Sequence, residues 1–325
     1  MMRISVVISA YNAKDFIGDT IRSALAQTVA PLEIIVVDDG STDSTAEIAE
    51  SLGCRVIRQA NKGVCVARNS GILAARGDWI ALLDHDDLWL PTKLERQVAA
   101  AAACPDVFCF ATDFQRLRAG QPVSPSCLAM PSYRFDQMTL QMVAPGITRC
   151  LNAGAEILVP GWFLFPSSML IRRDLLVDVG MFRSEQRLCE DVDCFLRVLS
   201  RTELVVVRES LWLWREHSSN TSKNVAGIAE GWLRLASYVD EAPTAYPTGC
   251  SVQLRPILRE MRRTLIFEYT ARRDFSSARR VSRTVFDGPS SIGDVVLALL
   301  VEMPSPVWNL LRRARRIVRS GSDGV

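Results

Sequence analysis

Over its first hundred residues the chain alternates between short apolar runs rich in β-branched residues and segments with apolar residues at helical spacing. Short apolar runs predict buried strands, and the helical spacing predicts amphipathic helices. Strands that alternate with helices in this way form βαβ units, which give a mostly parallel sheet with right-handed crossovers. The fold class is therefore α/β and Rossmann-like, with helices flanking the sheet. The expected strands cover residues 4–10, 33–38, 55–58 and 79–83, and the expected helices cover 17–27, 46–52, 64–75 and 91–103.

The pattern changes twice farther along the chain. From 118 to 161 it is lost, and a loop of that length inside a compact domain is uncommon and often functional. After about residue 225 the sequence becomes helical and rich in Arg, so we expect an α/β domain at 1–225 and a helical C-terminal extension at 226–325. Further strands are expected at 107–112, 167–171, 204–208 and 211–214, and further helices at 173–179 and 191–199.

The composition is that of an ordinary globular protein, with 48% apolar and 23% charged residues. The nine Cys are scattered without C-x-x-C spacing, which is typical of small apolar residues in a reducing compartment. The apolar start leads into Tyr11 and Asn12 rather than a small-residue cleavage site, and no run reaches the roughly 18 apolar residues of a spanning helix. We therefore expect a cytoplasmic protein without a signal peptide.

Charge is distributed unevenly along the chain. Residues 255–319 hold 14 Arg, no Lys and 6 acidic residues, whereas the rest has more acidic than basic residues. At 306–319 apolar residues lie at helical spacing between basic ones, as in helices that bind membrane interfaces. We expect peripheral attachment to the inner face of the cell membrane and no nucleic-acid partner, although a helix packed on the α/β domain has the same spacing. The arginines concerned are Arg312, Arg313, Arg315, Arg316 and Arg319.

Three of the expected strands end in polar clusters. In open α/β sheets, ligands bind beyond the carboxyl ends of the strands. Acidic residues at neighbouring strand ends repel one another, and a cation or hydrogen-bond donors on a ligand relieve that repulsion. The clusters are Ser9, Tyr11 and Asn12 after the first strand, Asp38, Asp39 and Ser41 after the second, and Asp84, His85, Asp86 and Asp87 after the strand at 79–83.

Asp84, Asp86 and Asp87 form the densest of these clusters. Hard divalent cations prefer carboxylate oxygens, and a cation held by one or two carboxylates keeps positions free for substrate phosphates. Such a site can neutralise a departing diphosphate. The alternative is a solvated acidic turn before the helix that starts at Pro91, with Asp87 as a local cap. His85 receives no role.

Asp38 and Asp39 suit a different ligand. A carboxylate accepts hydrogen bonds from the imide N–H of uracil or thymine and from ribose hydroxyls, and the Tyr11 ring can stack on a base. The alternatives are a turn at Asp39 with Asp43 capping the next helix, and ordinary packing for Tyr11. The chain has no P-loop and no G-x-G-x-x-G after its first strand, which counts against an ATPase and a nicotinamide-dependent enzyme.

Two further residues stand alone in the sequence. Arg68 lies near the middle of an expected helix, where it can reach a phosphate, steady the Asp cluster or form a structural salt bridge. His217 follows an expected strand and is one of two His, so it is a candidate for a metal ligand or a phosphate contact. A structural histidine fits that position equally well.

Glu190, Asp191 and Asp193 lie at the start of the helix expected at 191–199. Acidic residues there interact favourably with the backbone dipole, but three in four positions exceed what capping needs. A carboxylate on the first turn can take a proton from an attacking hydroxyl, and a second carboxylate beside it raises its pKa. Asp193 can instead hold the helix through a salt bridge. Helical spacing does not decide which of the three is the base.

Together these motifs resemble the family 2 glycosyltransferases with the GT-A fold. Their order and spacing match from the N-terminus through about His217, and five motifs in order are highly specific. The last hundred residues are not covered by the resemblance. The matching segments are SVVISAYN at 5–12, VVDDGSTD at 36–43, ARNSG at 67–71, LDHDDLW at 83–89 and EDVDCFLR at 190–197.

Position by position, the resemblance implies a metal-dependent, inverting enzyme. Asp84 and Asp86 match the D-x-D motif that binds Mn²⁺ or Mg²⁺, with Asp86 as the expected direct ligand and His217 as a further candidate. Asp191 matches the general base, and Glu190 lies beside it. The implied contacts to the nucleotide-sugar are Ser9, Tyr11, Asp38, Asp39, Arg68, Asp84 and Asp86.

The implied reaction moves a hexose or N-acetylhexosamine from a UDP-sugar, or from a dTDP-sugar, to an acceptor hydroxyl. The acceptor is a lipid-linked glycan or another hydroxyl compound in cell-surface glycan assembly. None of the seven Trp follows an Arg, so the Q-x-x-R-W motif of processive synthases is missing and a single addition is expected. Two alternatives stay open: a sugar nucleotidyltransferase, which should have a basic, glycine-rich loop after the first strand, and a non-catalytic scaffold subunit.

Overall fold

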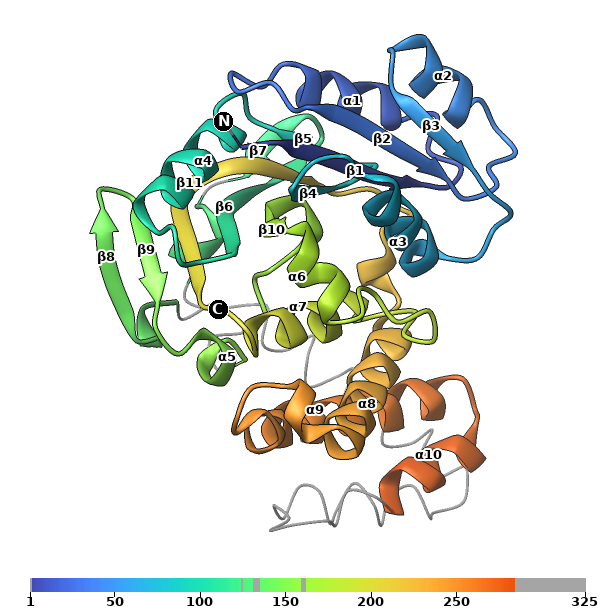
Figure 1. The fold of residues 1–325 in the computed structure, drawn as a ribbon. Helices are drawn as coiled ribbons and strands as arrows, with labels where there is room; N and C mark the ends of the chain where they lie inside the picture. Colours follow the sequence, from blue (N-terminus) through green and yellow to red (C-terminus); the bar gives the residue numbers. More distant parts are fainter. Residues whose placement is uncertain (1, 124, 131–134, 159–161, 284–325) are drawn as a thin grey trace, which may run out of the picture. The chain divides into compact units, whose positions relative to one another are not determined.

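A computed structural model describes residues 2–123, 125–130, 135–158 and 162–283 of the chain (Figure 1). The described chain forms two compact units. The first comprises residues up to Lys223 together with Arg234–Leu254, and the second comprises Asn224–Leu233 and the residues from Arg255 onward. The domain boundary expected at residue 225 stays a prediction. The amphipathic segment at 306–319 lies outside the described residues.

The first unit contains one large mixed sheet, whose strands lie in the order β3-β2-β1-β4-β10-β6-β11-β9-β8, with β5 beside β11 and β7 beside β6. Its strands are β1 (Ile4–Ala10), β2 (Glu33–Asp38), β3 (Arg55–Arg58), β4 (Trp79–Asp84), β5 (Leu88–Trp89), β6 (Cys109–Arg118), β7 (Gln121–Val123), β8 (Leu140–Ala144), β9 (Ile147–Cys150), β10 (Leu170–Arg172) and β11 (Leu204–Arg215). The helices that follow or precede them are α1 (Ile17–Leu25), α2 (Thr45–Ser51), α3 (Val64–Ala74), α4 (Lys93–Ala103), α5 (Ala153–Glu156), α6 (Arg173–Asp178) and α7 (Glu190–Leu199).

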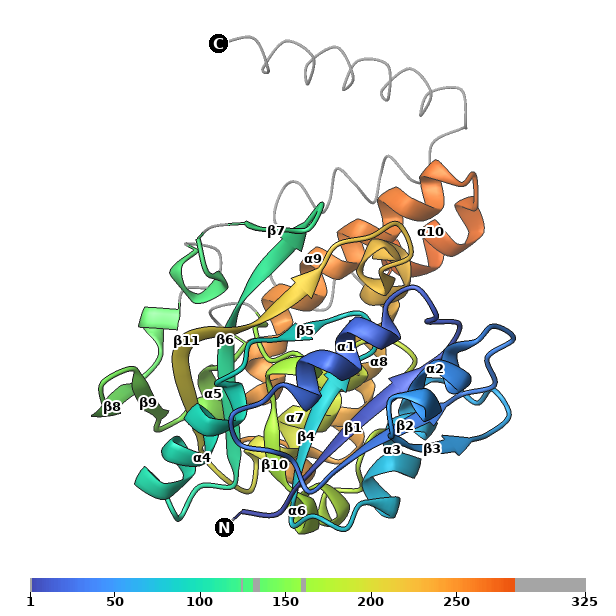
Figure 2. The same cartoon turned by 90° about the horizontal axis from the view of Figure 1, so that it is seen from above.

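Strand direction sets where the carboxyl ends meet. β3, β2, β1 and β4 are mutually parallel, β10 is antiparallel to both of its neighbours, and β11 is parallel to β6. The sheet is therefore mostly parallel in its first half, as predicted. Figure 2 shows these strands side by side, seen from above. In the register, Ala10 lies opposite Asp38 and Ser9 lies opposite Asp84, so three polar strand ends share one edge.

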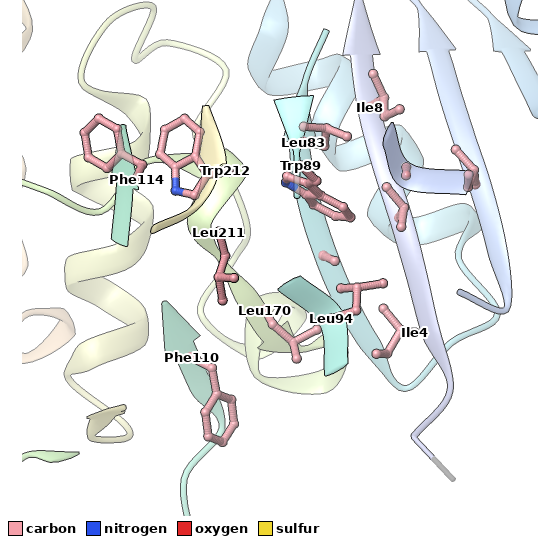
Figure 3. Close-up of a cluster of buried hydrophobic side chains, with 14 of the residues drawn as sticks. Ile4, Ile8, Leu83, Trp89, Leu94, Phe110, Phe114, Leu170, Leu211 and Trp212 are labelled. Atoms are coloured by element: carbon pink, nitrogen blue, oxygen red, sulfur yellow. The ribbon is translucent and has the colours of Figure 1, made fainter. Parts of the chain in front are cut away.

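Alternate side chains of β1 pack on opposite faces of the sheet. Ile4 and Ile8 of β1 pack with Leu94 of α4 in a cluster that also includes α1 residues (Figure 3). Val7 points to the opposite face, where a Cβ on Gly71 of α3 would lie 2.4 Å from its Cγ1. This close approach of α3 to the sheet requires glycine. Figure 1 shows α1 and α2 on one face of the sheet and α3, α6 and α7 on the other.

Three sequence predictions about elements were wrong. The strands expected at 204–208 and 211–214 form one strand, β11, whose pairing with β6 shifts register between Val207 and Trp212. Such a bulge keeps a strand continuous although its apolar pattern is interrupted. The strand expected at 167–171 begins only at Leu170, because Pro166–Ser168 forms a 3₁₀ turn. The segment expected to be irregular contains the β8–β9 hairpin.

The second unit is helical where the structure describes it. Its residues come from the first part of α8 (Val225–Glu241), most of α9 (Cys250–Ala271) and α10 (Phe275–Arg283). Ala229 and Leu265 lie in its small core, and the Tyr269 hydroxyl donates to Glu230 at 2.5 Å. No helix in the described part of the chain is long and apolar enough to span a membrane.

Candidate active site

The carboxyl end of β2 is fixed by Asp39. Its backbone N–H donates to the Ala10 carbonyl at 2.8 Å, and the side chain is 3% exposed. Its carboxylate accepts from the backbone N–H groups of Lys62 and Gly63 at 2.9 and 2.8 Å and from Gln59 Nε2 at 2.7 Å. Bonds to a charged oxygen are stronger than neutral ones. Asp39 therefore organises the loop before α3, and of about four lone-pair sites one remains.

The other predicted nucleoside contacts lie at the same edge of the sheet. Ser9 and Asp38 are buried, whereas the Tyr11 ring is 47% exposed. The Asp38 carboxylate accepts from the Ser41 N–H at 3.2 Å, which closes the turn after β2. An exposed aromatic ring beside buried acceptors suits a flat ligand such as a nucleobase.

The turn that carries the D-x-D motif is hydrogen-bonded to α1 and within itself. The Asp87 N–H donates to the Asp84 carbonyl at 3.2 Å. The hydroxyl of Thr20, a fully buried residue of α1, lies 2.8 Å from the His85 carbonyl and 2.9 Å from the Asp87 carbonyl. Packing of α1 against this turn therefore fixes the backbone from which the acidic side chains extend.

Asp87 is structural, and it is not a helix cap. Its buried carboxylate accepts from the Ser167 hydroxyl at 2.6 Å and from the Arg215 N–H at 3.2 Å, so it joins the turn to β11. Burial, and then the charges of Asp86 and Asp84, raise the pKa of Asp87 well above its usual value. The Asp87 carboxyl thus keeps its proton to a higher pH than an exposed aspartate does.

The carboxyl ends of β1, β2 and β4 form the edge of the sheet that we call the donor edge, because we propose that the sugar donor binds there. Arg68 links this edge to α7. Its guanidinium lies 2.7 Å from Asp84 Oδ1 and 2.7 Å from Glu190 Oε1, and its carbon lies 5.1 Å from the centre of the Phe182 ring. The Arg68 side chain is only 6% exposed. Although burial opposes the charge, the two carboxylates hold the pKa of Arg68 above its usual value. The ion pair with Asp84 agrees with one of the three interpretations that the sequence left open for Arg68.

Asp191 lies on the first turn of α7. Burial and, to a smaller extent, the neighbouring charge of Glu190 raise the pKa of this carboxyl to about 7, although Arg68 opposes the shift. Its Oδ1 accepts from the Val192 N–H at 2.9 Å, and its Oδ2 accepts from Trp162 Nε1 at 3.3 Å. A carboxyl with a pKa near neutrality can take up a proton at physiological pH.

Asp86 and His217 approach each other at the end of β11. Asp86 Oδ2 lies 2.8 Å from His217 Nε2, and His217 Nδ1 lies 2.8 Å from the Ser219 hydroxyl. The Phe16 ring lies 4.5 Å from the imidazole, centre to centre. Among residues 2–123, 125–130, 135–158 and 162–283, no three acidic, His or Cys side chains converge on one point. A carboxylate and an imidazole this close fit a cation with two protein ligands and open positions.

Asp193 has the structural role that its sequence position allowed. Its fully buried carboxylate forms an ion pair with Arg197 at 2.5 Å and accepts from the Tyr246 hydroxyl at 2.5 Å. The Arg183 guanidinium lies 4.4 Å from the centre of the Tyr238 ring. Residues of 234–254 therefore hold α7 and the loop before it in place.

Sequence reasoning did not predict the contacts of three residues that shape this site. Gln59 bonds to Asp39, Phe182 lies under Arg68, and Trp162 donates to Asp191. Each lies outside the regular elements, where no periodic pattern marks a side chain. The density of aromatic residues at 162–165 was the one local signal available for Trp162.

Comparison with known sequences finds glycosyltransferases. The profile of the glycosyl transferase family 2 matches residues 5–155. An uncharacterized glycosyltransferase of Nostoc sp. is 45% identical over 103 residues, which are 30% of this chain and 32% of that protein. The Escherichia coli UDP-Glc:alpha-D-GlcNAc-diphosphoundecaprenol beta-1,3-glucosyltransferase WfaP is 44% identical over 102 residues, 30% of this chain and 41% of its own length. The chain thus spans less than half of either relative.

Longer and weaker matches agree with these. An uncharacterized glycosyltransferase of Rickettsia typhi is 28% identical over 240 residues, 72% of this chain and 70% of its own length. S. aureus TarS 1–349 in complex with UDP-GlcNAc has a TM-score of 0.60 at 18% identity, over 92% of this chain and 79% of that one. The mannosyltransferase PcManGT from Pyrobaculum calidifontis, in complex with GDP-Man and Mn²⁺, has a TM-score of 0.56 at 15% identity, over 96% and 84%. Residues 5–155 therefore form a glycosyl transferase family 2 domain, and the fold of the described chain is the GT-A fold.

Proposed function

We propose that the chain transfers a sugar from a UDP-sugar to an acceptor hydroxyl by a single displacement with inversion. The observation that carries this proposal is the position of Asp191. Its carboxyl has a pKa of about 7, and the Glu190–Arg68–Asp84 ion pairs connect its helix to the end of β4. A base near neutrality is thereby held beside the edge where a nucleotide-sugar would bind.

The donor contacts follow the polar edge of the sheet. Tyr11 would stack on the base, and Ser9, Asp38 and Asp39 would accept from the base imide or the ribose. UDP is the expected nucleotide because TarS is described in complex with UDP-GlcNAc and WfaP uses UDP-Glc. The single lone-pair site left on Asp39 suits one imide N–H.

Asp86 and His217 are the proposed ligands of a divalent cation. Asp84 belongs to the same turn as Asp86, and its second carboxylate oxygen, Oδ2, is not the one that pairs with Arg68. The mannosyltransferase from Pyrobaculum calidifontis is described with Mn²⁺, which supports Mn²⁺ or Mg²⁺ here. A bound cation would neutralise charge on the departing diphosphate. Arg68, buried against Asp84, fixes the orientation of that carboxylate.

In the reacting complex Asp191 takes the proton of the acceptor hydroxyl. The acceptor oxygen then forms a bond to the anomeric carbon while the bond from that carbon to the diphosphate oxygen breaks. The nucleoside diphosphate leaves from the opposite face, so the anomeric configuration inverts. The electron pair of the broken bond stays on the diphosphate, and the proton stays on Asp191 until the product departs.

The assay for this proposal measures which nucleotide product is released from UDP-glucose or UDP-N-acetylglucosamine with Mn²⁺ and with EDTA. We expect UDP, released only with the metal, and a product whose proton NMR coupling shows the inverted anomer. Pyrophosphate release would indicate a nucleotidyltransferase. A product with the donor's configuration, or full activity in EDTA, would refute the mechanism.

A lipid-linked glycan is the proposed acceptor, in the assembly of a cell-surface polysaccharide or glycolipid. WfaP acts on a GlcNAc-diphosphoundecaprenol, and the sequence at 306–319 has the basic amphipathic pattern of interfacial segments. Each Arg near an anionic surface contributes roughly 1 kcal/mol to binding. Flotation with phosphatidylglycerol vesicles should recover the whole chain. Equal recovery after deletion of residues 304–325, or with neutral lipid, would exclude attachment through this segment.

A further inference from the structure

Trp162 lies against the same face of α7 as the proposed base. Its Nε1 lies 3.3 Å from Asp191 Oδ2, and its ring is stacked on Phe195 with the ring centres 6.5 Å apart at 11°. Asp191 and Phe195 are four residues apart, so their side chains are neighbours on one side of the helix. One indole therefore contacts both: its ring packs on the phenylalanine, and its N–H reaches the carboxylate.

We propose that Trp162 is a positioning residue for Asp191, fixing the plane of its carboxyl group so that an acceptor hydroxyl meets a free lone pair. This inference rests on the proposed function, in which Asp191 is the base. Of the two carboxyl oxygens, one is held by the Val192 N–H of its own helix and the other by Trp162. With both bonds made, rotation of the carboxyl group is blocked, and each oxygen keeps one further lone pair.

The bond also acts on the charge of the base. An indole N–H is a donor only, and a donor pairs more strongly with an ionised oxygen than with a neutral one. It therefore offsets part of the burial and of the repulsion by Glu190 that raise the pKa of Asp191. The other polar groups around this carboxyl are Arg68, which favours the ionised form, and the Cys189 thiol, whose pKa burial raises beyond the physiological range.

Other tryptophans of the described chain show that this arrangement is not a general consequence of burial. Trp89 donates its Nε1–H to the Ser167 carbonyl at 2.9 Å, within the core. Trp212 is 1% exposed, and its buried Nε1 has no hydrogen-bond partner among the described residues. Trp162, by contrast, directs its N–H to a titrating carboxylate. That difference points to control of the base rather than to packing alone.

The test replaces Trp162 with Phe, which keeps an aromatic ring against Phe195, although a smaller one, and removes the N–H donor. The acid limb of the kcat–pH profile should move to higher pH by about half a pH unit to one pH unit, because the ionised form of Asp191 loses one hydrogen bond. At pH 6 this lowers kcat about three- to tenfold. The affinity for UDP, measured by calorimetry, should stay unchanged because the proposed contacts to the nucleoside, Tyr11, Asp38 and Asp39, lie at the ends of β1 and β2 and not on α7.

The matched control is Tyr246→Phe, which removes a hydrogen bond to Asp193 on the same helix. It should lower the melting temperature and leave the acid limb in place. If the limb moves equally in both variants, Trp162 acts only through the stability of α7 and the inference is wrong. It is also wrong if Trp162→Phe leaves the limb where it was.

A direct measurement covers the case of a poorly folding or inactive variant. Carbon-13 NMR titration of Asp carboxyls in the whole chain follows Asp191, identified by its loss in Asp191→Asn, without turnover. A titration in Trp162→Phe that overlays the wild type would refute the inference. Full turnover in Asp191→Asn would instead remove the proposed base itself, so the two failures are distinguishable.

Discussion

The donor edge of the sheet and the first turn of α7 hold their carboxylates in different ways. At the donor edge, Asp39 accepts from two backbone N–H groups and from the Gln59 side chain, and Asp38 accepts from a third backbone N–H, so most of the donors are loop backbone groups. On α7, Asp191 is surrounded by side chains from distant parts of the chain, Trp162 and Arg68 among them. Backbone partners fix the orientation of a carboxylate and cannot be removed by a side-chain substitution, whereas the side-chain partners of Asp191 can be changed one at a time.

Arg68 is where the two regions meet. It is the partner of Asp84 on β4 and of Glu190 on α7, each at 2.7 Å. A buried cation shared by two carboxylates leaves a net negative charge, which a ligand's hydrogen-bond donors or a cation can balance. Substitutions at the end of the sheet, on α7 and at Arg68 itself therefore test how the donor edge and the first turn of α7 differ.

The largest effect is expected from Asp191→Asn. Loss of a general base typically costs 10²–10⁴ in rate, so kcat should fall by at least two decades while UDP affinity is retained. Glu190→Gln is the control and should lower kcat less. The melting temperature of Asp191→Asn at pH 8 should not fall, because the amide removes a buried charge. Turnover above a tenth of wild type in Asp191→Asn would exclude this residue as the base.

Arg68→Met tests the link between the two regions. Removing one member of a buried ion pair leaves Asp84 and Glu190 uncompensated, which should cost about 3–5 kcal/mol of unfolding free energy in urea. The control is Arg58→Met, whose pairs with Glu47 and Glu50 are about half exposed and should matter far less. Equal losses in the two variants would mean that the Arg68 network contributes no more than a surface pair.

Asp39→Ala tests the donor edge, where backbone N–H groups hold the carboxylates. Three donors lose a buried partner, at a cost of about 1–3 kcal/mol each. The base imide of UDP also loses its proposed acceptor, so UDP affinity with Mn²⁺ should weaken by one to two decades. Asp43→Ala is the control, since its carboxylate also accepts from backbone N–H groups, those of Lys14 and Thr45. It should lose stability and keep its affinity for UDP. If both variants bind UDP as wild type does, Asp39 only shapes the loop.

The smallest expected effect is a shift in the pH dependence of kcat through the pKa of Asp191. Glu190→Gln removes a negative charge beside Asp191 and frees Arg68 to act on it, so the pKa of Asp191 should fall. The acid limb of kcat, near pH 7 in the wild type, should move to lower pH by about one unit. An upward or absent shift would show that Glu190 does not set this titration.

The same assignment has a consequence for stability. The folded state keeps the Asp191 proton up to about pH 7, whereas an unfolded Asp releases it near pH 4. The contribution of this group to the unfolding free energy is therefore largest below pH 4 and is lost as the pH rises toward 7. Because Glu190→Gln should lower the pKa of Asp191 in the folded state, the pH range over which this contribution is lost should end at a lower pH.

The donor edge could be predicted from sequence because its residues come in contiguous clusters. Asp38, Asp39, Asp84 and Asp86 each follow a strand, and parallel strands bring their carboxyl ends to one edge. The ion pair of Arg68 with Asp84 was one of three interpretations left open by its position. The structural role of Asp87 was not predicted, because its partners Ser167 and Arg215 are 80 and 128 residues away.

The surroundings of the base could not be predicted in this way. Trp162 and Asp191 are 29 residues apart, and neither lies in a pattern that specifies the other. The choice among Glu190, Asp191 and Asp193 depended on the resemblance, because helical spacing leaves all three possible. The β8–β9 hairpin was missed although Pro145 and Gly146 mark a turn, since the flanking residues alternate too weakly to indicate strands.

The order of strands in the sheet has a consequence for synthesis on the ribosome. β4 and β6 are not neighbours: β10 lies between them, and β11 covers the other side of β6. Because β10 ends at residue 172, both edges stay open for about 3–10 seconds after β6 has been made, at ordinary translation rates. Open, apolar strand edges pair with other chains. A gene fragment ending at residue 155 should therefore aggregate, and the nascent chain should depend on holdase chaperones until β10 emerges.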